Sequence, residues 1–222
     1  MKTIVISSQK GGSAKSTLTA HLAVEAERAG DGPVWLIDTD QQGTLSRWHE
    51  RRESETPQRM EVPFKALEKG LEKARSQSVA FCLIDTAPAI SEQNAAIIAL
   101  ADLVVIPVQP SPADLWAVAD TIELVKAAAK PFLFVLTKAN AQANLTAQSV
   151  AALSHHGPVA QAFIANRVSY AAAFASGNTA PEMNAKGAAA VEMIALWQEI
   201  KASFNKAAKQ QSVKAAKRVQ HG

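Results

Sequence analysis

Short apolar runs recur along the 222-residue chain and alternate with longer stretches of helix-forming sequence. Most runs are apolar throughout, as in strands that are covered on both faces of a sheet. We expect strands at Thr3–Ser7, Val34–Asp38, Val79–Asp85, Leu103–Val108, Phe132–Thr137 and Val159–Ile164, with a weaker one near Met60–Phe64. We expect helices at about Lys15–Ala29, Lys65–Ser76, Ser91–Ala101, Pro112–Ala129, Leu145–Ser154 and Lys186–Lys206. This alternation predicts an α/β fold: a mostly parallel, twisted sheet with helices on both faces.

Composition and charge bound the domain organisation. With 48% hydrophobic residues, the chain can bury one sizeable core, and we expect a single domain over residues 1–208 followed by a basic tail over 209–222. Cys82 is the only cysteine, so an internal disulfide and a cysteine metal cluster are excluded. The N-terminus enters a strand without a secretion signal, and no apolar run is long enough to span a membrane. We therefore expect a cytoplasmic protein.

The stretch KTIVISSQKGGSAKST joins the first expected strand to the first expected helix. In an open α/β sheet, ligands bind beyond the carboxyl ends of the strands, and a helix N-terminus there attracts anions. Gly11 and Gly12 would let a phosphate approach the backbone closely, Lys15 would reach the terminal phosphates, and Ser16 would ligate Mg²⁺. Ala14 stands where the usual loop has glycine, so we expect ordinary backbone angles there. The alternative is a glycine-rich turn with a solvated Lys15.

Three carboxylates follow two of the expected strands. Asp38 and Asp40 lie at and just beyond the end of one strand, and Asp85 ends another after four apolar or small residues. A carboxylate at such a position is costly unless it binds something, and magnesium-bound water is a common partner. Asp38 or Asp40 could instead cap the following helix or turn.

Four segments resemble the nucleotide site of the ParA/MinD class of ATPases: QKGGSAKST, LIDTDQQGTLSRW, CLIDTAPA and VIPVQPSPADLWA. That class carries a deviant phosphate loop, K-G-G-x-x-K-[ST], which leaves the position of Ala14 open and requires Lys10. The resemblance extends over nearly the whole chain and is strongest to small plasmid-partition ParA proteins without an N-terminal DNA-reading domain. It implies a phosphate-loop NTPase fold that binds ATP and Mg²⁺.

The resemblance also implies roles for matching residues. Lys10 would be the signature lysine, which reaches the partner's phosphates across a nucleotide-sandwich homodimer. Lys15 would bind the β- and γ-phosphates, Asp40 would position or activate the attacking water, and Ser16, Asp38 and Asp85 would serve the metal. The implied nucleotide contacts are Gly11, Gly12, Ser13, Ala14, Lys15, Ser16 and Thr17 at the phosphates, and Thr137, Lys138, Asn166 and Arg167 near the adenine. The last four could equally be turn or surface residues. Asp114 would lie near the nucleotide and the dimer interface.

The C-terminal charge pattern bears on the partner. After Glu199 the chain has six basic residues and no acidic one: Lys201, Lys206, Lys209, Lys214, Lys217 and Arg218. Such a segment suits non-specific binding to DNA phosphates, although it could be only a solubilising terminus. It has few large apolar residues, so we expect no stable membrane association. Family resemblance adds a nucleoid location and a centromere-binding ParB-like partner that stimulates slow hydrolysis.

Other functions remain open at this point. A MinD-like positioning ATPase would act on a membrane, and a nucleotide-binding module with little turnover would fit the departure at Ala14. A phosphate-loop synthetase or kinase would need a pocket for an acceptor substrate, which the sequence does not reveal. An electron carrier of the nitrogenase-reductase type is excluded, because one cysteine cannot hold its cluster.

Overall fold

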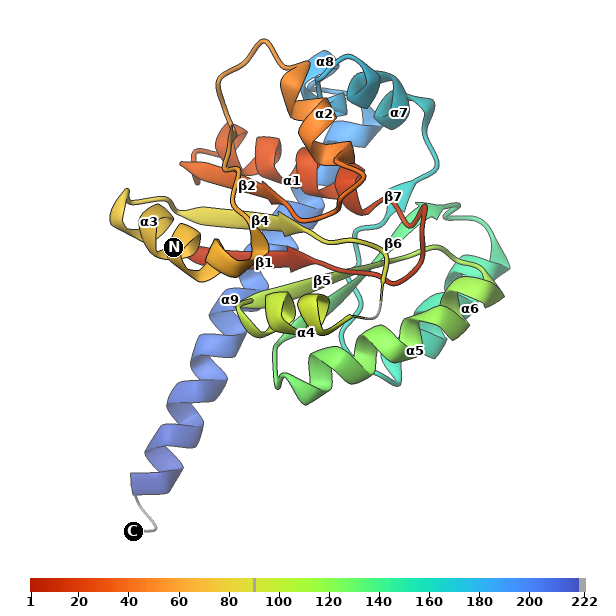
Figure 1. The fold of residues 1–222 in the computed structure, drawn as a ribbon. Helices are drawn as coiled ribbons and strands as arrows, with labels where there is room; N and C mark the ends of the chain where they lie inside the picture. The colour runs from red at the N-terminus through yellow and green to blue at the C-terminus, as the bar shows by residue number, and fades with distance from the viewer. Residues whose placement is uncertain (90, 220–222) are drawn as a thin grey trace.

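The computed structural model describes residues 1–89 and 91–219, and side chains up to Phe204 apart from residue 90. The strands are β1 (Lys2–Ile6), β2 (Val34–Asp38), β3 (Gln58–Arg59), β4 (Phe81–Asp85), β5 (Leu103–Val108), β6 (Phe132–Ala139) and β7 (Ile164–Ala165). They pair in the order β3-β2-β4-β1-β5-β6-β7, and every pair is parallel (Figure 1). The expected α/β fold is confirmed.

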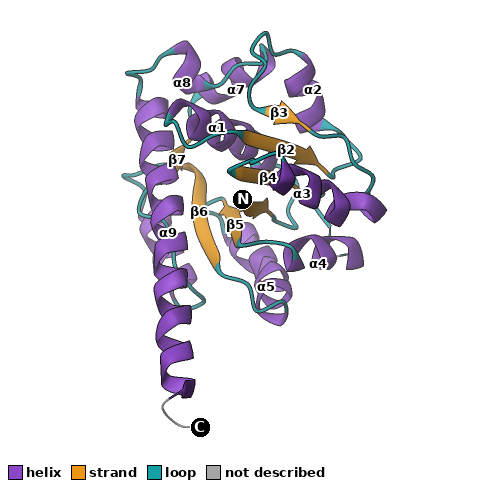
Figure 2. Ribbon diagram, turned by 90° about the vertical axis from the view of Figure 1, so that its left-hand side faces the viewer, coloured by secondary structure: helices purple, strands orange, loops and turns teal. Residues whose placement is uncertain are grey.

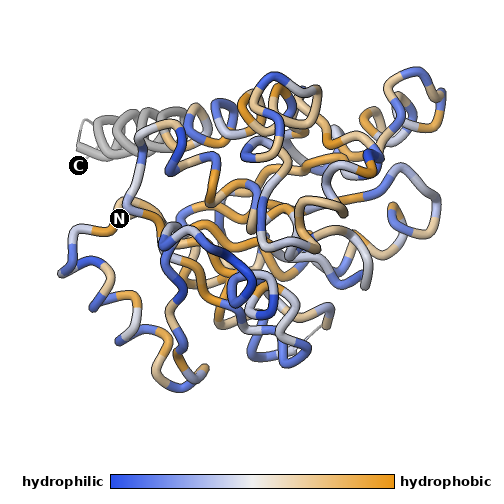
Figure 3. Tube along the Cα trace, turned by 90° about the horizontal axis from the view of Figure 1, so that it is seen from above, coloured by the Kyte–Doolittle hydropathy of each residue, from blue (hydrophilic) through white to orange (hydrophobic). Residues whose placement is uncertain are grey.

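Helices cover both faces of this sheet (Figures 1 and 2). One face carries α1 (Lys15–Arg28), α2 (Thr44–Glu50), α7 (Val168–Ala175), α8 (Ala180–Met183) and α9 (Ala188–Val219). The other carries α3 (Leu67–Ser76), preceded by the short helix η1 (Phe64–Ala66), α4 (Glu92–Ala99), α5 (Pro112–Ala127) and α6 (Asn144–Ser154). Within β1, Ile4 and Ile6 pack on the first face and Val5 on the second. Apolar strand residues therefore fill the centre of the molecule, with polar segments at its rim (Figure 3).

Most expected elements occur, and their boundaries are most accurate in the buried strands. The ranges of β2 and β5 agree with the prediction, because apolar runs bounded by polar residues mark both ends. The expected strand over 159–164 is reduced to β7 and an isolated bridge between Val159 and Phe134, and the weaker strand near Met60 is displaced to β3. Helices α2, α7 and α8 were not expected.

Helix α9 extends past the expected end at Lys206 to Val219. The boundary expected between residues 208 and 209 therefore falls inside this helix, and the basic side chains beyond Phe204 lie outside those that the structure describes. No helix in the described part of the chain has an apolar stretch of the length that a membrane span requires.

Candidate functional site

The loop between β1 and α1 lies at the carboxyl edge of the sheet, where β1 is flanked by β4 and β5. A cavity of about 370 Å³ opens beside this loop. It is lined by Gly11, Gly12, Ala14, Lys15, Ser16, Thr17, Asp40, Gln42, Thr44, Pro88 and Lys138. The loop residues expected at the phosphates thus share a cavity with Asp40, which comes from the segment after β2. Gln42, Thr44 and Pro88 were not expected there, although each belongs to or follows a segment that contains a predicted site residue.

Ala14 does not keep ordinary backbone angles, so that expectation was wrong. Its φ is 70° and its ψ is 24°, in the left-handed region, and it is the N-cap of α1. The Ala14 carbonyl accepts the first hydrogen bond of that helix from Leu18 at 2.8 Å. Gly12 also has a positive φ, of 76°. The loop therefore requires a left-handed conformation at position 14 even though the residue there is not glycine. Alanine adopts this conformation at a cost of about 1 kcal/mol.

Side chains from the ends of β5 and β6 fix the carbonyl groups of the loop. The Gly12 carbonyl accepts hydrogen bonds from Gln109 Nε2 at 2.7 Å and from Lys138 Nζ at 3.0 Å. The fully buried Thr137 hydroxyl donates to the Ser13 carbonyl at 3.1 Å. Thr137 therefore stabilises the phosphate loop through the Ser13 carbonyl. Its expected contact with adenine stays a prediction. Gln109 was missed as a support because no local pattern connects it to Gly12.

Lys15 is nearly buried at the base of the cavity. Its Nζ donates to the Lys10 carbonyl at 3.2 Å, and only 7% of the residue is exposed. Burial lowers the pKa of this ammonium group, while Asp85 and Asp40 oppose that shift. A lysine with so few protein acceptors is available to an anionic ligand.

Ser16 and Asp85 form the second part of the site. Ser16 Oγ donates to Asp85 Oδ2 at 2.5 Å, and Thr19 Oγ1 lies 3.5 Å from Oδ1. Asp85 is fully buried, and this burial raises its pKa to about 7. A buried carboxylate beside a hydroxyl offers the hard oxygen ligands that Mg²⁺ prefers. The described residues contain no group of three or more His, Cys, Asp or Glu that could hold a metal ion, here or elsewhere. A Mg²⁺ ion at Ser16 and Asp85 would therefore take its other ligands from phosphate and water.

Asp38 and Asp40 make different contacts. Asp38 Oδ2 accepts from the Ser46 backbone N–H at 2.8 Å and from its hydroxyl at 2.9 Å, and Oδ1 accepts from Asp40 N–H at 3.1 Å. Asp38 thus caps helix α2, and a role near the metal would come through water. Asp40 Oδ1 accepts from Gln42 N–H at 3.0 Å, and its carboxylate borders the cavity.

Lys10 lies at the rim of the loop and forms an ion pair with Asp114, in the first turn of α5. The two residues are 104 positions apart. Asp114 was expected near the nucleotide and the dimer interface, and the structure places it at Lys10. A cross-subunit role for Lys10 stays a prediction.

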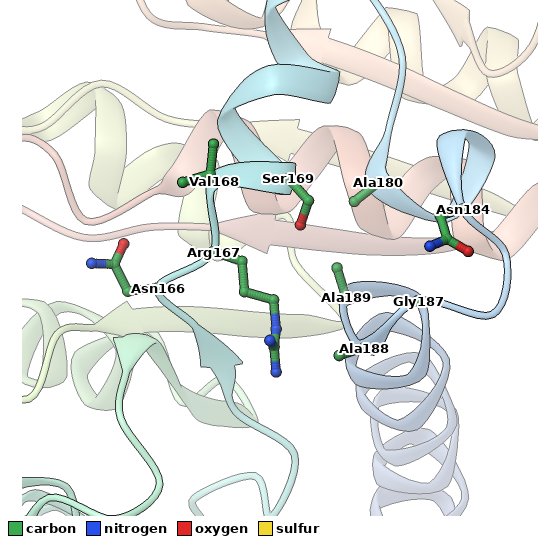
Figure 4. Close-up of a pocket in the computed structure, with 9 residues that line it drawn as sticks. All are labelled: Asn166, Arg167, Val168, Ser169, Ala180, Asn184, Gly187, Ala188 and Ala189. Atoms are coloured by element: carbon green, nitrogen blue, oxygen red, sulfur yellow. The ribbon is translucent and has the colours of Figure 1, made fainter.

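A second cavity, of about 580 Å³, shares Lys138 with the first and also contains Asn166 and Arg167. The contact of Asn166 and Arg167 with adenine stays a prediction. Arg167 is held by Glu192, with Nε 2.8 Å and Nη2 2.6 Å from Oε1. On the other side of the same segment, Asn166, Arg167 and the first turn of α9 line a third pocket of about 400 Å³ (Figure 4). Asn166 and Arg167 point in different directions there.

Comparison with known proteins places this chain in a family. A profile of the VirC1 protein family matches residues 1–207. The chain is 26% identical over 201 residues to maintenance of carboxysome distribution protein A of Halothiobacillus neapolitanus, covering 86% of this chain and 92% of that one. It is 29% identical over 128 residues to protein ParA of Rhizobium radiobacter, 56% of each chain. MinD of Pyrococcus horikoshii, solved with Mg-ADP, has the same fold: the TM-score is 0.73 at 16% identity, over 90% of this chain and 95% of that one.

Proposed function

Because the chain belongs to the VirC1 family, within the ParA/MinD class of ATPases, we propose that it is an ATP-driven DNA partition switch. ATP brings two copies together as a sandwich dimer, and the dimer binds nucleoid DNA non-specifically. Slow hydrolysis, stimulated by a centromere-bound ParB-like partner, returns the chain to a form that leaves DNA. This cycle would place the protein in the cytoplasm, on the nucleoid.

One observation carries the ATPase part of this proposal. A single cavity brings together the loop backbone, the ammonium group of Lys15, and the carboxylate of Asp40, with the Ser16–Asp85 pair at its base. Phosphoryl transfer depends mainly on positioning the reactants and on neutralising charge. These groups are of the types that ATP hydrolysis requires. Lys15 would bind the β- and γ-phosphates and Asp40 would orient the attacking water. Mg²⁺, held by Ser16 and, through water, by Asp85 and Asp38, would neutralise charge on the phosphates.

Lys10 would complete the site of the opposite subunit. A lysine supplied from a partner can stabilise developing phosphate charge as an arginine finger does, so hydrolysis would depend on dimerisation. The position of Lys10 at the rim of the loop, with 36% of its side chain exposed, suits this role.

The DNA part of the proposal rests on the basic residues after Glu199 and on the relatives. One relative is named for the maintenance of carboxysome distribution, which supports a role in distributing cargo, and another is named ParA, like the class that the chain resembles. The main alternative is a MinD-like ATPase that acts on a membrane. From Lys201 onwards the chain offers only Phe204, Val213 and Val219 as large apolar residues, which disfavours membrane binding.

A gel-shift assay with random duplex DNA, in ATP, ADP or no nucleotide, tests the switch. We expect retention with ATP alone and a steep loss of binding as salt rises, because DNA binding releases counterions. DNA retention that ignores the nucleotide would contradict the switch. ATP-dependent binding to anionic vesicles, with no DNA retention, would instead support the membrane alternative.

The variant Asp40→Ala tests the assignment of the water-positioning carboxylate. It should retain ATP-dependent dimers and lose hydrolysis. An unchanged rate would show that another carboxylate has this role. A wild-type rate at background level, with DNA and all candidate partners present, would favour a nucleotide-binding module with little turnover.

A further inference from the structure

Lys10 is held within its own subunit. Its ammonium group pairs with the carboxylate of Asp114, of which only 4% is exposed. The Ser111 hydroxyl also donates to that carboxylate and accepts from the Asp114 backbone N–H at 3.1 Å. Ser111 therefore holds Asp114 at the N-terminus of the 16-residue helix α5 independently of Lys10. Lys10 pairs with a nearly buried carboxylate.

The neighbours of Lys10 are held by the same segment. Gln109, just before α5, donates from Nε2 to the Gly12 carbonyl at 2.7 Å. The Gln9 amide, turned to satisfy both of its neighbours, donates to Asp120 Oδ2 at 3.0 Å and accepts from Thr121 N–H at 3.1 Å. The first half of the phosphate loop is thus attached to the segment over 109–121 at three points.

We propose that Asp114 is a positioning residue that locks Lys10 in its own subunit and opposes dimerisation. The proposal rests on the proposed function, because it takes from it the cross-subunit role of Lys10. A lysine paired with Asp114 cannot also bind phosphates in a partner subunit, so each copy must break this ion pair when the dimer forms. Breaking it leaves a nearly buried carboxylate without its cation, which is unfavourable. The ATP-bound dimer should then be weaker than the same dimer with the lock removed.

The variant Asp114→Asn removes the charge and keeps a side chain that can accept from Ser111. We expect its ATP-dependent dimer to form at about five- to tenfold lower protein concentration than the wild-type dimer, since the lysine of the ion pair is 36% exposed and the pair is therefore of modest strength. Monomer affinity for ATP should change little. Glu123→Gln is the matched control, because Glu123 is an exposed acid of α5 that forms no ion pair among the described side chains. It should dimerise as the wild type does.

The experiment is sedimentation of the full chain with Mg-ATP, in wild type, Asp114→Asn, Glu123→Gln, Lys10→Ala and the Lys10→Ala/Asp114→Asn double variant. Lys10→Ala should stay monomeric because it lacks the cross-subunit contact, and the double variant should stay monomeric too, because the lock acts through Lys10. A purely structural effect of position 114 would persist in the double variant. Thermal unfolding checks that each variant is folded.

The outcomes separate the two proposals. Wild-type dimers that Asp114→Asn leaves unchanged or weakens would overturn the lock and leave the proposed function intact. A gain that persists without Lys10 would also overturn the lock. If neither wild type nor Asp114→Asn dimerises with ATP, the proposed function fails and the lock fails with it.

Discussion

His21 Nε2 accepts a hydrogen bond from the backbone N–H of Ala180 at 3.0 Å, and this bond joins helix α1 to the start of helix α8. The other ring nitrogen, Nδ1, lies 2.8 Å from the Thr17 carbonyl, which can only accept. The imidazole is therefore neutral, with its proton on Nδ1. It is fully buried against the edge of Tyr170, with ring centroids 5.1 Å apart. Protonation would add a hydrogen to Nε2, and two N–H donors would then face each other at Ala180.

Stability should fall in acid because of this histidine. Burial lowers the pKa of His21 from 6.5 to about 4, with Arg52 lowering it further and the Thr17 carbonyl and Glu182 opposing the shift. The unfolded chain then binds more protons than the folded one between about pH 6.5 and pH 4. The free energy of unfolding should therefore fall by about 3 kcal/mol as the pH is lowered from about 6.5 to about 4. Above about pH 6.5 the stability contributed by the neutral His21 should be complete.

Urea unfolding of wild type and His21→Asn between pH 4 and pH 7.5 measures this contribution. His21→Asn should be less stable at neutral pH and should lose most of the acid slope, with a smaller slope left from the partly buried His49, whose pKa is also lowered by burial. The exposed His156→Asn is the control and should keep the wild-type slope. An undiminished slope in His21→Asn would contradict the assignment.

We expect Asp38 to contribute mainly to stability and Asp40 mainly to the chemistry of the site. Asp38→Ala removes the acceptor for the Ser46 backbone and hydroxyl, so it should lower the free energy of unfolding of the nucleotide-free chain by about 1–2 kcal/mol. Asp40→Ala removes one bond to Gln42, at an exposed site, and should cost less than about 0.5 kcal/mol. Denaturant unfolding without nucleotide compares the two. Equal losses would show that the cap on α2 contributes little.

Gly177, in the turn between α7 and α8, packs closely against the backbone of the segment after α2. A Cβ atom there would lie 2.4 Å from the Arg51 backbone, and φ is +75°. Gly177→Ala should therefore cost more than about 3 kcal/mol, since backbone must move as well as adopt a strained angle. Gly30→Ala is the matched control, because Gly30 has the same φ with nothing within 4 Å, and it should cost about 1 kcal/mol. Similar losses in the two variants would show that the contact with Arg51 relaxes easily.

The sequence predicted those parts of the protein that depend on short stretches of chain. Strands β2 and β5 carry apolar residues towards both faces, so their composition alone marks them. Helix α2 has seven residues, and its N-cap residue, Gly43, is in a left-handed conformation and has no side chain that could cap the helix, so no local start signal was visible. Strand β7 has two residues, too few for a pattern.

The same distinction holds within the candidate site. The loop, Asp40 and Asp85 could be located because each lies at the end of a strand in a parallel sheet. The ion pair of Lys10 with Asp114 and the bond from Gln109 to Gly12 join residues 104 and 97 positions apart, and nothing local indicates them. The angles of Ala14 could not be predicted either, since the residue type argues for one conformation and the loop requires another.

Ala14→Gly should therefore stabilise the chain. Glycine adopts a φ of 70° without steric cost, and alanine there costs about 1 kcal/mol, part of which is offset by the greater freedom of glycine in the unfolded chain. We expect a gain of about 0.5–1 kcal/mol in the free energy of unfolding, measured in denaturant without nucleotide. Ala14→Val is the opposite variant and should lose at least about 1 kcal/mol, because a β-branched side chain tolerates the left-handed region poorly. A loss in Ala14→Gly would mean that the methyl group of Ala14 contributes more to stability than its backbone angle costs.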